Sequence, residues 1–344
     1  MGLQLQRDLS VAISEYAPGS QIVANGNLIT SRYIKKVPRM RWKMYDYVFC
    51  CDCNSLNIEL HVSDGNGSDE GCCRHCGVTL DQAKKKTFLV PEFGFEADGD
   101  RITRPGLKKP ERTYRSEVFY VGYRDDLQTQ RFDIDDSSIE IAMSRSDEMA
   151  VINESNFFVC ERCGYTELDE KCFSRYKRMK HKNSAGYWCH NDGTNTLKRF
   201  SLGYRFETDV LQLRFLSPDL IDSETATSLL YGIIRGVCKC LNIEQDDISG
   251  CLQYFYNDLS KRGNFGLILY DKTPGGAGHV RRLSDPITIK SVLLETLRLM
   301  KSCTCGGEDR DSSCYSCLRS YHNQKYHDVL SRGKVIAFLE DFIK

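Results

Sequence analysis

The 344-residue sequence has no net charge, because 47 lysines and arginines balance 47 aspartates and glutamates. Without a global attraction to polyanions, any nucleic-acid binding must come from local basic patches. No stretch is apolar enough to span a bilayer, and the N-terminal segment lacks the apolar region of a signal peptide. We therefore expect a cytoplasmic protein with no membrane partner.

Several catalytic motifs are also missing. The sequence contains no G-x4-G-K-[ST] phosphate loop, which excludes a P-loop motor within this chain. It has no H-x-K of the phospholipase-D-type nucleases, no H-E-x-x-H, and no paired H-x-E and P-C-x-x-C of the zinc deaminases. Enzymatic functions lose most of their support, and we assign no catalytic residue.

Cysteine, by contrast, is abundant. Seventeen are present, and most stand in pairs separated by one or two residues. In a reducing compartment thiols stay free, so this spacing indicates metal ligation rather than a disulfide framework. The hydrophobic fraction of 41% and the charged fraction of 27% are those of an ordinary globular protein.

The first candidate zinc site consists of two C-x2-C pairs joined by a polar loop, which is the spacing of a zinc-ribbon-like module. Its ligands are Cys50, Cys53, Cys73 and Cys76. Cys51 and Cys72 adjoin these ligands, so the choice between neighbours is open. Buried free thiols are the alternative explanation.

The second candidate site begins with Cys160-x2-Cys163. Its other ligands must lie downstream, among Cys172, His181, Cys189 and His190. We favour His181 and Cys189, which give a Cys3His set that is ordinary for zinc. Because this second pair lacks knuckle spacing, cysteines in the core are again the alternative.

The third candidate site has four cysteines within fifteen residues: Cys303, Cys305, Cys314 and Cys317. Like the other two, it offers four protein ligands and no open coordination position. Closed sets of this kind hold structural rather than hydrolytic zinc. The sequence therefore predicts two to three structural Zn²⁺ ions.

The fold class that we expect is α+β, in three parts. Residues 1–95 hold the zinc-ribbon-like module, 96–200 form a β-rich middle with the second zinc site, and 201–344 form an α/β zinc-binding domain. Alternating and β-branched runs predict strands at 118–123, 155–160 and 210–215. Apolar spacing predicts a helix at 223–241, and two more helices are expected near 288–301 and 327–343.

A glycine-rich turn follows a predicted buried strand at 266–271. If this turn opens a helix, its backbone N–H groups can hold a phosphate or contact a partner. Close backbone packing is the alternative. The contact candidates are Asp271, Gly275, Gly276, Gly278 and His279.

Three basic segments interleave cations with aromatic residues, a combination that can neutralise phosphates and stack on bases. Most such runs are only solvated surface. The DNA-binding candidates in these segments are Lys35, Lys36, Arg39, Arg41, Lys43, Lys108, Lys109, Lys177, Arg178 and Lys180.

The segment LYDKTPGGAGH at 269–279, followed by CTC and CYSC, resembles the MrfA-type zinc-binding (MZB) domain of helicases. Upstream, EYAPG at 15–19, FLVPEFGF at 88–95, and residues 202–203 and 208–211 resemble elements of large defence helicases. They are also similar to DrmB, the motorless partner of the DISARM helicase. The resemblance implies zinc on the four C-terminal cysteines, and a role beside DNA translocation in repair or phage defence.

We therefore expect a non-motor accessory subunit that binds DNA and a helicase or ATPase subunit in trans, in antiphage defence. Two alternatives stay open. One is a metal-dependent phosphodiesterase or nuclease that uses Asp271, His279 and Asp209. The other is that the chain is the C-terminal part of a single-chain DNA repair helicase.

Overall fold

A computed structural model describes residues 4–62, 71–99, 102–107, 110, 116–122, 129–134, 137–168, 180–189, 197–216, 221–257, 262–307 and 310–343. The α-helices are α1 (Leu9–Glu15), α2 (Ser223–Leu241), α3 (Pro286–Ser302) and α4 (Arg332–Phe342), with short 3-10 helices at η1 (Gln82–Lys84), η4 (Val280–Leu283) and η5 (Tyr321–Tyr326). The strands are β1 (Gln21–Ala24), β2 (Asn27–Ile34), β3 (Met44–Phe49), β4 (Leu56–Leu60), β5 (Lys86–Leu89), β6 (Phe95–Ala97), β7 (Ser116–Tyr120), β8 (Thr129–Ile134), β9 (Ser137–Val159), β10 (Thr166–Leu168), β11 (Lys198–Leu216), β12 (Ile248–Asn257) and β13 (Arg262–Asp271). This mixture of elements confirms the predicted α+β class.

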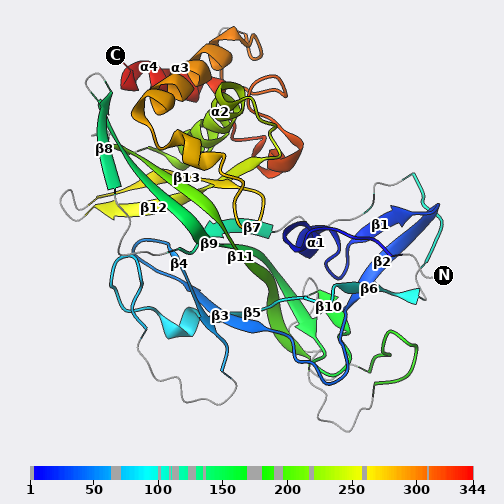
Figure 1. Cartoon of the computed structure of the whole chain (residues 1–344). Helices are drawn as coiled ribbons and strands as arrows, with labels where there is room; N and C mark the ends of the chain where they lie inside the picture. Colours follow the sequence, from blue (N-terminus) through cyan, green and yellow to red (C-terminus); the bar gives the residue numbers. More distant parts are fainter. Residues whose placement is uncertain are drawn as a thin grey trace.

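Two long antiparallel strands, β9 and β11, form the centre of the large sheet (Figure 1). The N-terminal half of β11 pairs with β5 in parallel, and its C-terminal half pairs with β13. The other edge of β9 carries β10, β7 and β8. The predicted boundaries at 95/96 and 200/201 fall inside β6 and β11, so hydrogen-bonded strands join the three predicted parts.

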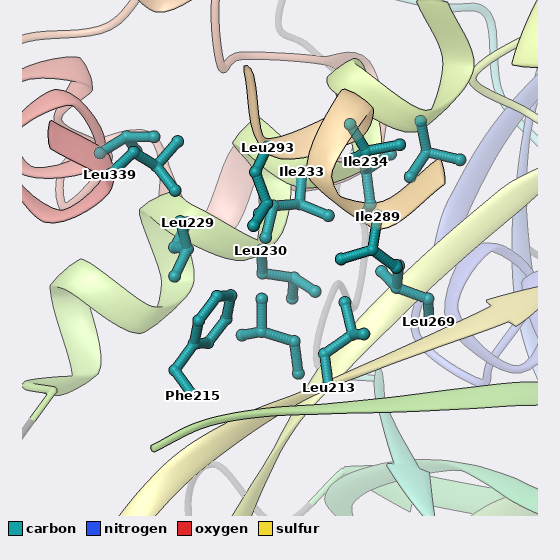
Figure 2. Packing of buried hydrophobic residues seen from close by; sticks show 14 of the residues in the cluster. Leu213, Phe215, Leu229, Leu230, Ile233, Ile234, Leu269, Ile289, Leu293 and Leu339 are labelled. Carbon is teal, nitrogen blue, oxygen red and sulfur yellow. The ribbon is translucent and has the colours of Figure 1, made fainter. Parts of the chain in front are cut away.

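The helices α2, α3 and α4 cover the C-terminal half of this sheet, at the top of Figure 1. Figure 2 shows Leu229, Leu230 and Ile233 of α2 above Leu213 and Phe215 of β11. These five side chains are buried, and each contributes roughly 1.5–3 kcal/mol by leaving water. The predicted helix at 223–241 is present with these bounds, because its apolar residues repeat at the helical period.

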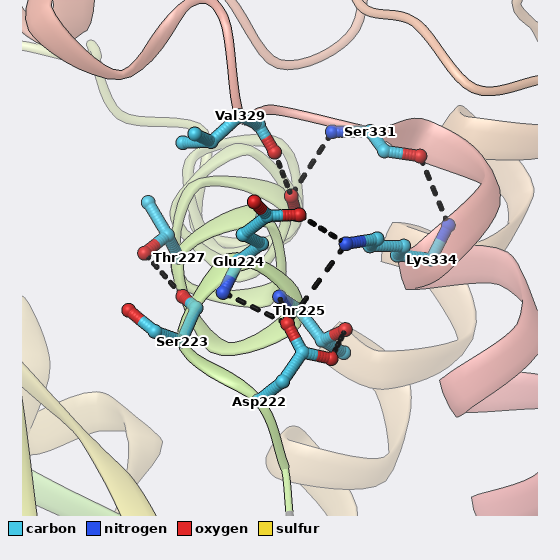
Figure 3. Close-up of polar contacts among 9 residues, drawn as sticks. Asp222, Ser223, Glu224, Thr225, Thr227, Val329, Ser331 and Lys334 are labelled. Atoms are coloured by element: carbon cyan, nitrogen blue, oxygen red, sulfur yellow. Dashed lines mark hydrogen bonds and ion pairs between the residues drawn. The ribbon is translucent and has the colours of Figure 1, made fainter.

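Polar contacts fasten the start of α2 to α4 (Figure 3). The Asp222 carboxylate caps α2 by accepting hydrogen bonds from the backbone N–H groups of Glu224 and Thr225, each at 2.9 Å. Lys334 of α4 pairs with Glu224 and lies 3.9 Å from Asp222. Partial burial raises the pKa of Asp222. The hydrogen bonds and Lys334 outweigh this effect, so the pKa lies below its ordinary value.

Two helical predictions need correction. The expected helix at 327–343 begins only at Arg332, because Ser331 caps it by accepting a hydrogen bond from the Lys334 N–H. The glycine turn after β13 leads into η4, a four-residue 3-10 helix, and α3 starts later, at Pro286. Within the described ranges, no helix is long and apolar enough to cross a membrane.

Candidate metal centres

The structure brings together all three predicted ligand sets. Within each set, the ligand atoms lie within 4.8 Å of one another. A tetrahedral zinc ion with Zn–S bonds of about 2.3 Å separates its sulfurs by about 3.8 Å. The observed separations are 3.5 Å for Cys50–Cys76, 3.9 Å for Cys160–Cys189 and 3.7 Å for Cys305–Cys317. These distances fit zinc and are far too long for disulfide bonds.

Three of the C-x2-C turns share one backbone conformation. In each, the carbonyl of the first cysteine accepts a hydrogen bond from the residue after the second cysteine, and that residue has a positive φ. The pairs are Cys50 with Asn54 (φ 52°), Cys73 with Gly77 (φ 74°) and Cys160 with Gly164 (φ 78°). Glycine and asparagine tolerate this left-handed conformation, so the local sequence shapes the turn that aims two thiolates at one ion.

The first site sits on two β-hairpins, as expected for a zinc ribbon. Its first knuckle joins β3 to β4, and an isolated bridge between Cys72 and Thr79 flanks the second. Cys51 and Cys72 are exposed and stand outside the ligand set. The Asn57 amide donates to the Cys73 sulfur at 3.5 Å, and its oxygen accepts from the Arg74 N–H at 3.0 Å. Sequence reasoning missed Asn57, because its pairing across the hairpin depends on register.

This first module packs against the C-terminal strands. The buried Gln253 of β12 donates to the Ser55 hydroxyl at 2.6 Å, and the Cys53 thiol contacts the same hydroxyl at 3.2 Å. His75, between the ligands of the second knuckle, lies with its ring 6.1 Å from that of Tyr120 in β7. Burial lowers the pKa of His75, which favours the neutral imidazole at this contact.

The second site joins the turn between β9 and β10 to a hairpin at 180–189, which we term the zinc hairpin. The Cys189 N–H donates to the His181 carbonyl at 2.9 Å, so the two favoured ligands close the base of this hairpin. The His181 ring stacks on Tyr165 of the β9–β10 turn, with ring centroids 4.5 Å apart. The other candidates, Cys172 and His190, lie outside the described residues.

The third site lies at the end of α3, against the helical core. Cys303 caps α3, and the Cys314 N–H points to the Cys317 sulfur at 3.1 Å. Gly306 has a φ of 78° and packs so close to Ser312 that a Cβ would lie 2.3 Å from its hydroxyl. This contact holds the long loop between the two cysteine pairs close to the ligands.

A buried arginine supports the presence of metal at the third site. Arg332 is 3% exposed, and its guanidinium donates to the carbonyls of Cys305 at 2.8 Å, Met300 at 3.3 Å and Gly307 at 3.5 Å. A buried cation needs a nearby opposite charge. Four thiolates outweigh one Zn²⁺, so an occupied centre supplies that charge. Arg332 follows the last ligand by fifteen residues and carries no motif that sequence reasoning could use.

The remaining described cysteines behave differently from the ligand sets. Burial raises the pKa of Cys238 to about 11 and that of Cys251 to about 12, so both thiols stay protonated at neutral pH. Cys240, like Cys51 and Cys72, is exposed. These five cysteines therefore stand outside the ligand sets, whereas the clustered ones have the geometry of metal ligands.

The glycine turn after β13 is organised around Asp271, whose side chain is fully buried. One carboxylate oxygen accepts from the N–H groups of Ala277 at 2.7 Å, Gly278 at 2.6 Å and His279 at 3.1 Å, and the other accepts from Val280 at 3.0 Å. The donors that a phosphate would need are thus already used. These hydrogen bonds favour the close-packing alternative.

Close packing also involves Asp209, a fully buried residue of β11. A Cβ on Gly276, whose φ is 80°, would lie 2.3 Å from an Asp209 carboxylate oxygen. Asp209 pairs with Arg281 at 2.7 Å. Among the described residues, neither Asp209, Asp271 nor His279 belongs to a cluster of metal-ligand type. The structure therefore adds no support for a metal-dependent nuclease at this turn.

The DNA-binding candidates divide into two groups. Those outside the described residues are Lys108, Lys109, Lys177 and Arg178. Of the others, Lys36 is half-buried, and the exposed ones are Lys35, Arg39, Arg41, Lys43 and Lys180. Lys43 pairs with Glu92 at 2.7 Å, and its DNA contact, like the others, stays a prediction.

The C-terminal part of the chain, which holds the third site, is similar to an MZB-type domain. Residues 229–318 match the family model of the MrfA Zn-binding domain, a range that includes all four C-terminal ligands and the glycine turn. The predicted resemblance is confirmed. Together with the three ligand sets, the match supports two to three zinc ions.

A curated relative extends the similarity to nearly the whole chain. The Druantia protein DruE of Escherichia coli (strain UMEA 4076-1) is 25% identical over 368 residues, which cover 96% of this chain and 19% of DruE. The chain thus spans about a fifth of that relative's length. The crystal structure of the helicase MrfA bound to DNA aligns with 70% of this chain and 26% of its own, with 13% identity and a TM-score of 0.33. That likeness is too weak to establish a common fold.

Proposed function

We propose that this chain is a DNA-binding, helicase-associated zinc protein of an antiphage defence system, and that it works beside a nucleotide-driven motor. The MZB match supports the association, because MrfA is a helicase whose solved structure contains DNA. The similarity to a Druantia protein supports the defence role over repair. The missing phosphate loop supports a motor located outside these 344 residues.

The observation that carries the DNA-binding proposal is the meeting of two basic segments at the second zinc site. The loop at 35–43 holds five cations and no acidic residue, and the zinc hairpin also lacks acidic residues. The Ile34 N–H donates to the Gly164 carbonyl at 2.9 Å, and Lys36 donates to the Glu161 carbonyl. Tyr33 donates to the Lys182 carbonyl at 3.3 Å. Segments about 150 residues apart in sequence thereby share one surface.

We term this surface the basic face and define it by its exposed cations: Lys35, Arg39, Arg41, Lys180 and Lys182. Clustered cations release counterions when they meet a phosphate backbone, so binding should weaken steeply with salt. The two zinc-knuckle contacts hold the loop in place beside the hairpin. The face therefore suits a polyanion even though the whole chain is neutral.

The test is the salt dependence of DNA affinity. Arg39→Gln with Arg41→Gln should weaken binding. It should also reduce the slope of log K against log salt, for each phosphate that is no longer neutralised, by about 0.9 on duplex DNA or about 0.7 on a single strand. Arg298→Gln with Lys301→Gln on α3 removes the same charge from a surface outside the basic face and should leave both quantities unchanged. Equal effects of the two double variants would contradict a local DNA site.

The motor is proposed to act in trans. Co-purification should then recover a subunit with DNA-dependent ATP hydrolysis, while this chain alone hydrolyses none. The alternative is that the chain acts as one part of a longer helicase polypeptide, and its coverage of only 19% of DruE favours that arrangement. Detection of motor and zinc-binding peptides in one polypeptide of the native protein would decide for it.

A further inference from the structure

Two adjacent aromatic side chains on the zinc hairpin are the most exposed aromatic residues in the described part of the chain, ahead of Tyr315 at 61% and Tyr321 at 59%. Tyr187 is 74% exposed and Trp188 is 65% exposed. The only other tryptophan of the chain, Trp42, is 7% exposed and donates to the Lys35 carbonyl at 3.0 Å. Large exposed aromatic groups are usually binding surfaces, because they bury much area at low entropic cost.

The hairpin holds these rings on a rigid support. The Asn183 side chain accepts from the N–H groups of Ala185 at 3.2 Å and Tyr187 at 2.9 Å, and the Asn183 N–H donates to the Tyr187 carbonyl at 2.8 Å. At the base, His181 and Cys189 are both zinc-ligand candidates. A support fixed at both ends loses little freedom on binding, which favours affinity.

The chemistry around the rings is cationic. Lys182 pairs with Trp188 across the hairpin, and its ammonium lies 5.8 Å from the Trp188 ring centroid. Lys180 is exposed on the same hairpin, and Tyr33 of β2, just before the loop at 35–43, donates to the Lys182 carbonyl. Exposed aromatic rings beside cations are the features with which proteins hold single strands: rings stack on bases and cations neutralise phosphates.

We propose that Tyr187 and Trp188 stack on unpaired bases of single-stranded DNA, while Lys180 and Lys182 contact its phosphates. This inference rests on the proposed DNA-binding function and names the form of DNA that the basic face binds. Paired bases are stacked inside a duplex, so rings on a hairpin reach a base plane only where the strands are separated. A motor that separates strands would supply such a site.

The presence of only two tryptophans makes the stacking directly measurable. In a Trp42→Phe variant, Trp188 is the sole tryptophan emitter. Titration with oligo(dT) of about 12 nucleotides, within the usual site size, should quench this emission. The same phosphate concentration as duplex should quench it much less. In a Trp188→Phe variant, the remaining emission comes from Trp42, whose ring is buried and cannot stack on a base, so oligo(dT) should quench it much less.

Affinity measurements test the energetic contribution. Trp188→Ala should weaken oligo(dT) binding by about 5- to 150-fold, the range expected when one base no longer stacks, whereas Trp188→Phe should keep most of the affinity. Duplex affinity should change little in both. Unchanged zinc content in each variant, measured by elemental analysis, shows that the hairpin is still folded.

Three outcomes would overturn the stacking site. Unchanged oligo(dT) affinity in Trp188→Ala, together with weakened binding in the Arg39/Arg41 variant, would remove the aromatic contribution but leave the proposed function intact. If Trp188→Ala no longer co-purifies with the motor but keeps its oligo(dT) affinity, the rings belong to a protein interface instead. Failure of the wild-type chain to bind any DNA, alone or with its motor, would remove both proposals.

Discussion

The zinc-bound hairpins and the helix-covered half of the sheet are stabilised in different ways. Around the first site, the buried cluster consists of three ligands together with Val48 and Leu80. Around the third site, the ligands border a large aliphatic core built from α2, α3, α4 and the sheet. We therefore expect the first zinc-bound module to depend on its metal for most of its stability. The C-terminal region has an aliphatic core of its own, to which the metal adds.

The largest expected effect follows from removing a ligand of a hairpin site. Cys53→Ser should abolish zinc binding at the first site, where binding contributes on the order of 10–16 kcal/mol to local folding. The β3–β4 hairpin should then lose hydrogen-exchange protection, and zinc content should fall by one ion per chain. Cys305→Ser should lose one ion while α2 keeps its protection. Cys240→Ser, an exposed non-ligand, should lose none.

If α2 unfolds in the Cys305→Ser variant as much as β3–β4 does in the Cys53→Ser variant, the two regions do not differ in their dependence on zinc. It would mean that the C-terminal core also depends on its metal. Zinc stoichiometry from elemental analysis separates loss of the ion from loss of structure.

The next largest effect is expected from a cavity in the helical core. Ile233 is fully buried between α2 and the sheet, so Ile233→Ala should destabilise this half by about 2–5 kcal/mol. Urea unfolding followed by helix circular dichroism measures the change. Zinc content should stay the same, because no ligand is touched. Loss of zinc from the first two sites would show that the two regions are not independent.

A smaller effect is expected from Arg332, which sharpens the comparison at the third site. Arg332→Met should weaken zinc binding there by about 10- to 100-fold, as for other groups next to a metal centre. Arg332→Lys should retain part of the affinity because it keeps the charge. Chelator competition measures both. Equal affinities of the wild type and Arg332→Met would exclude charge compensation by the guanidinium.

The smallest effect is expected at the cap of α2. Asp222→Ala should cost about 1 kcal/mol of stability by leaving the N–H groups of Glu224 and Thr225 without their acceptor. Asp222→Asn should cost less, since it still accepts. Because the folded pKa of Asp222 is lowered, its ionic contribution is present above the ordinary carboxyl pKa and lost as pH falls through the folded value. The two variants are therefore compared with the wild type by their unfolding midpoints at neutral pH.

Short-range features were predictable because they depend on neighbouring residues. The cysteine spacing indicated the first and third ligand sets and the first pair of the second, and the apolar period of α2 gave its bounds. The residue after each knuckle, Asn54, Gly77 or Gly164, also signals the left-handed turn. The downstream partners of Cys160 were harder, because four residues were available and only proximity in space separates them.

Long-range features were not predictable from these patterns. The length of β9 was hidden because much of it is buried on both faces, so no clear alternation marks its ends. The Asp271 carboxylate could equally have faced a ligand, and only the folded turn shows that it accepts four N–H groups of its own chain. Arg332 reaches the third site by the packing of α4 on α3.

By itself, the sequence determined an α+β chain with three zinc-ligand sets and a C-terminal region similar to the MZB domain, since ligand spacing and helical period are properties of a few consecutive residues. Only the tertiary structure decided that the loop at 35–43 meets the Cys160–Cys163 knuckle of the second zinc site, that Trp188 stands exposed while Trp42 is buried, and that Arg332 lies beside the third site. The physical reason is that strand register and helix packing bring together residues whose separation in sequence carries no information about their distance in space.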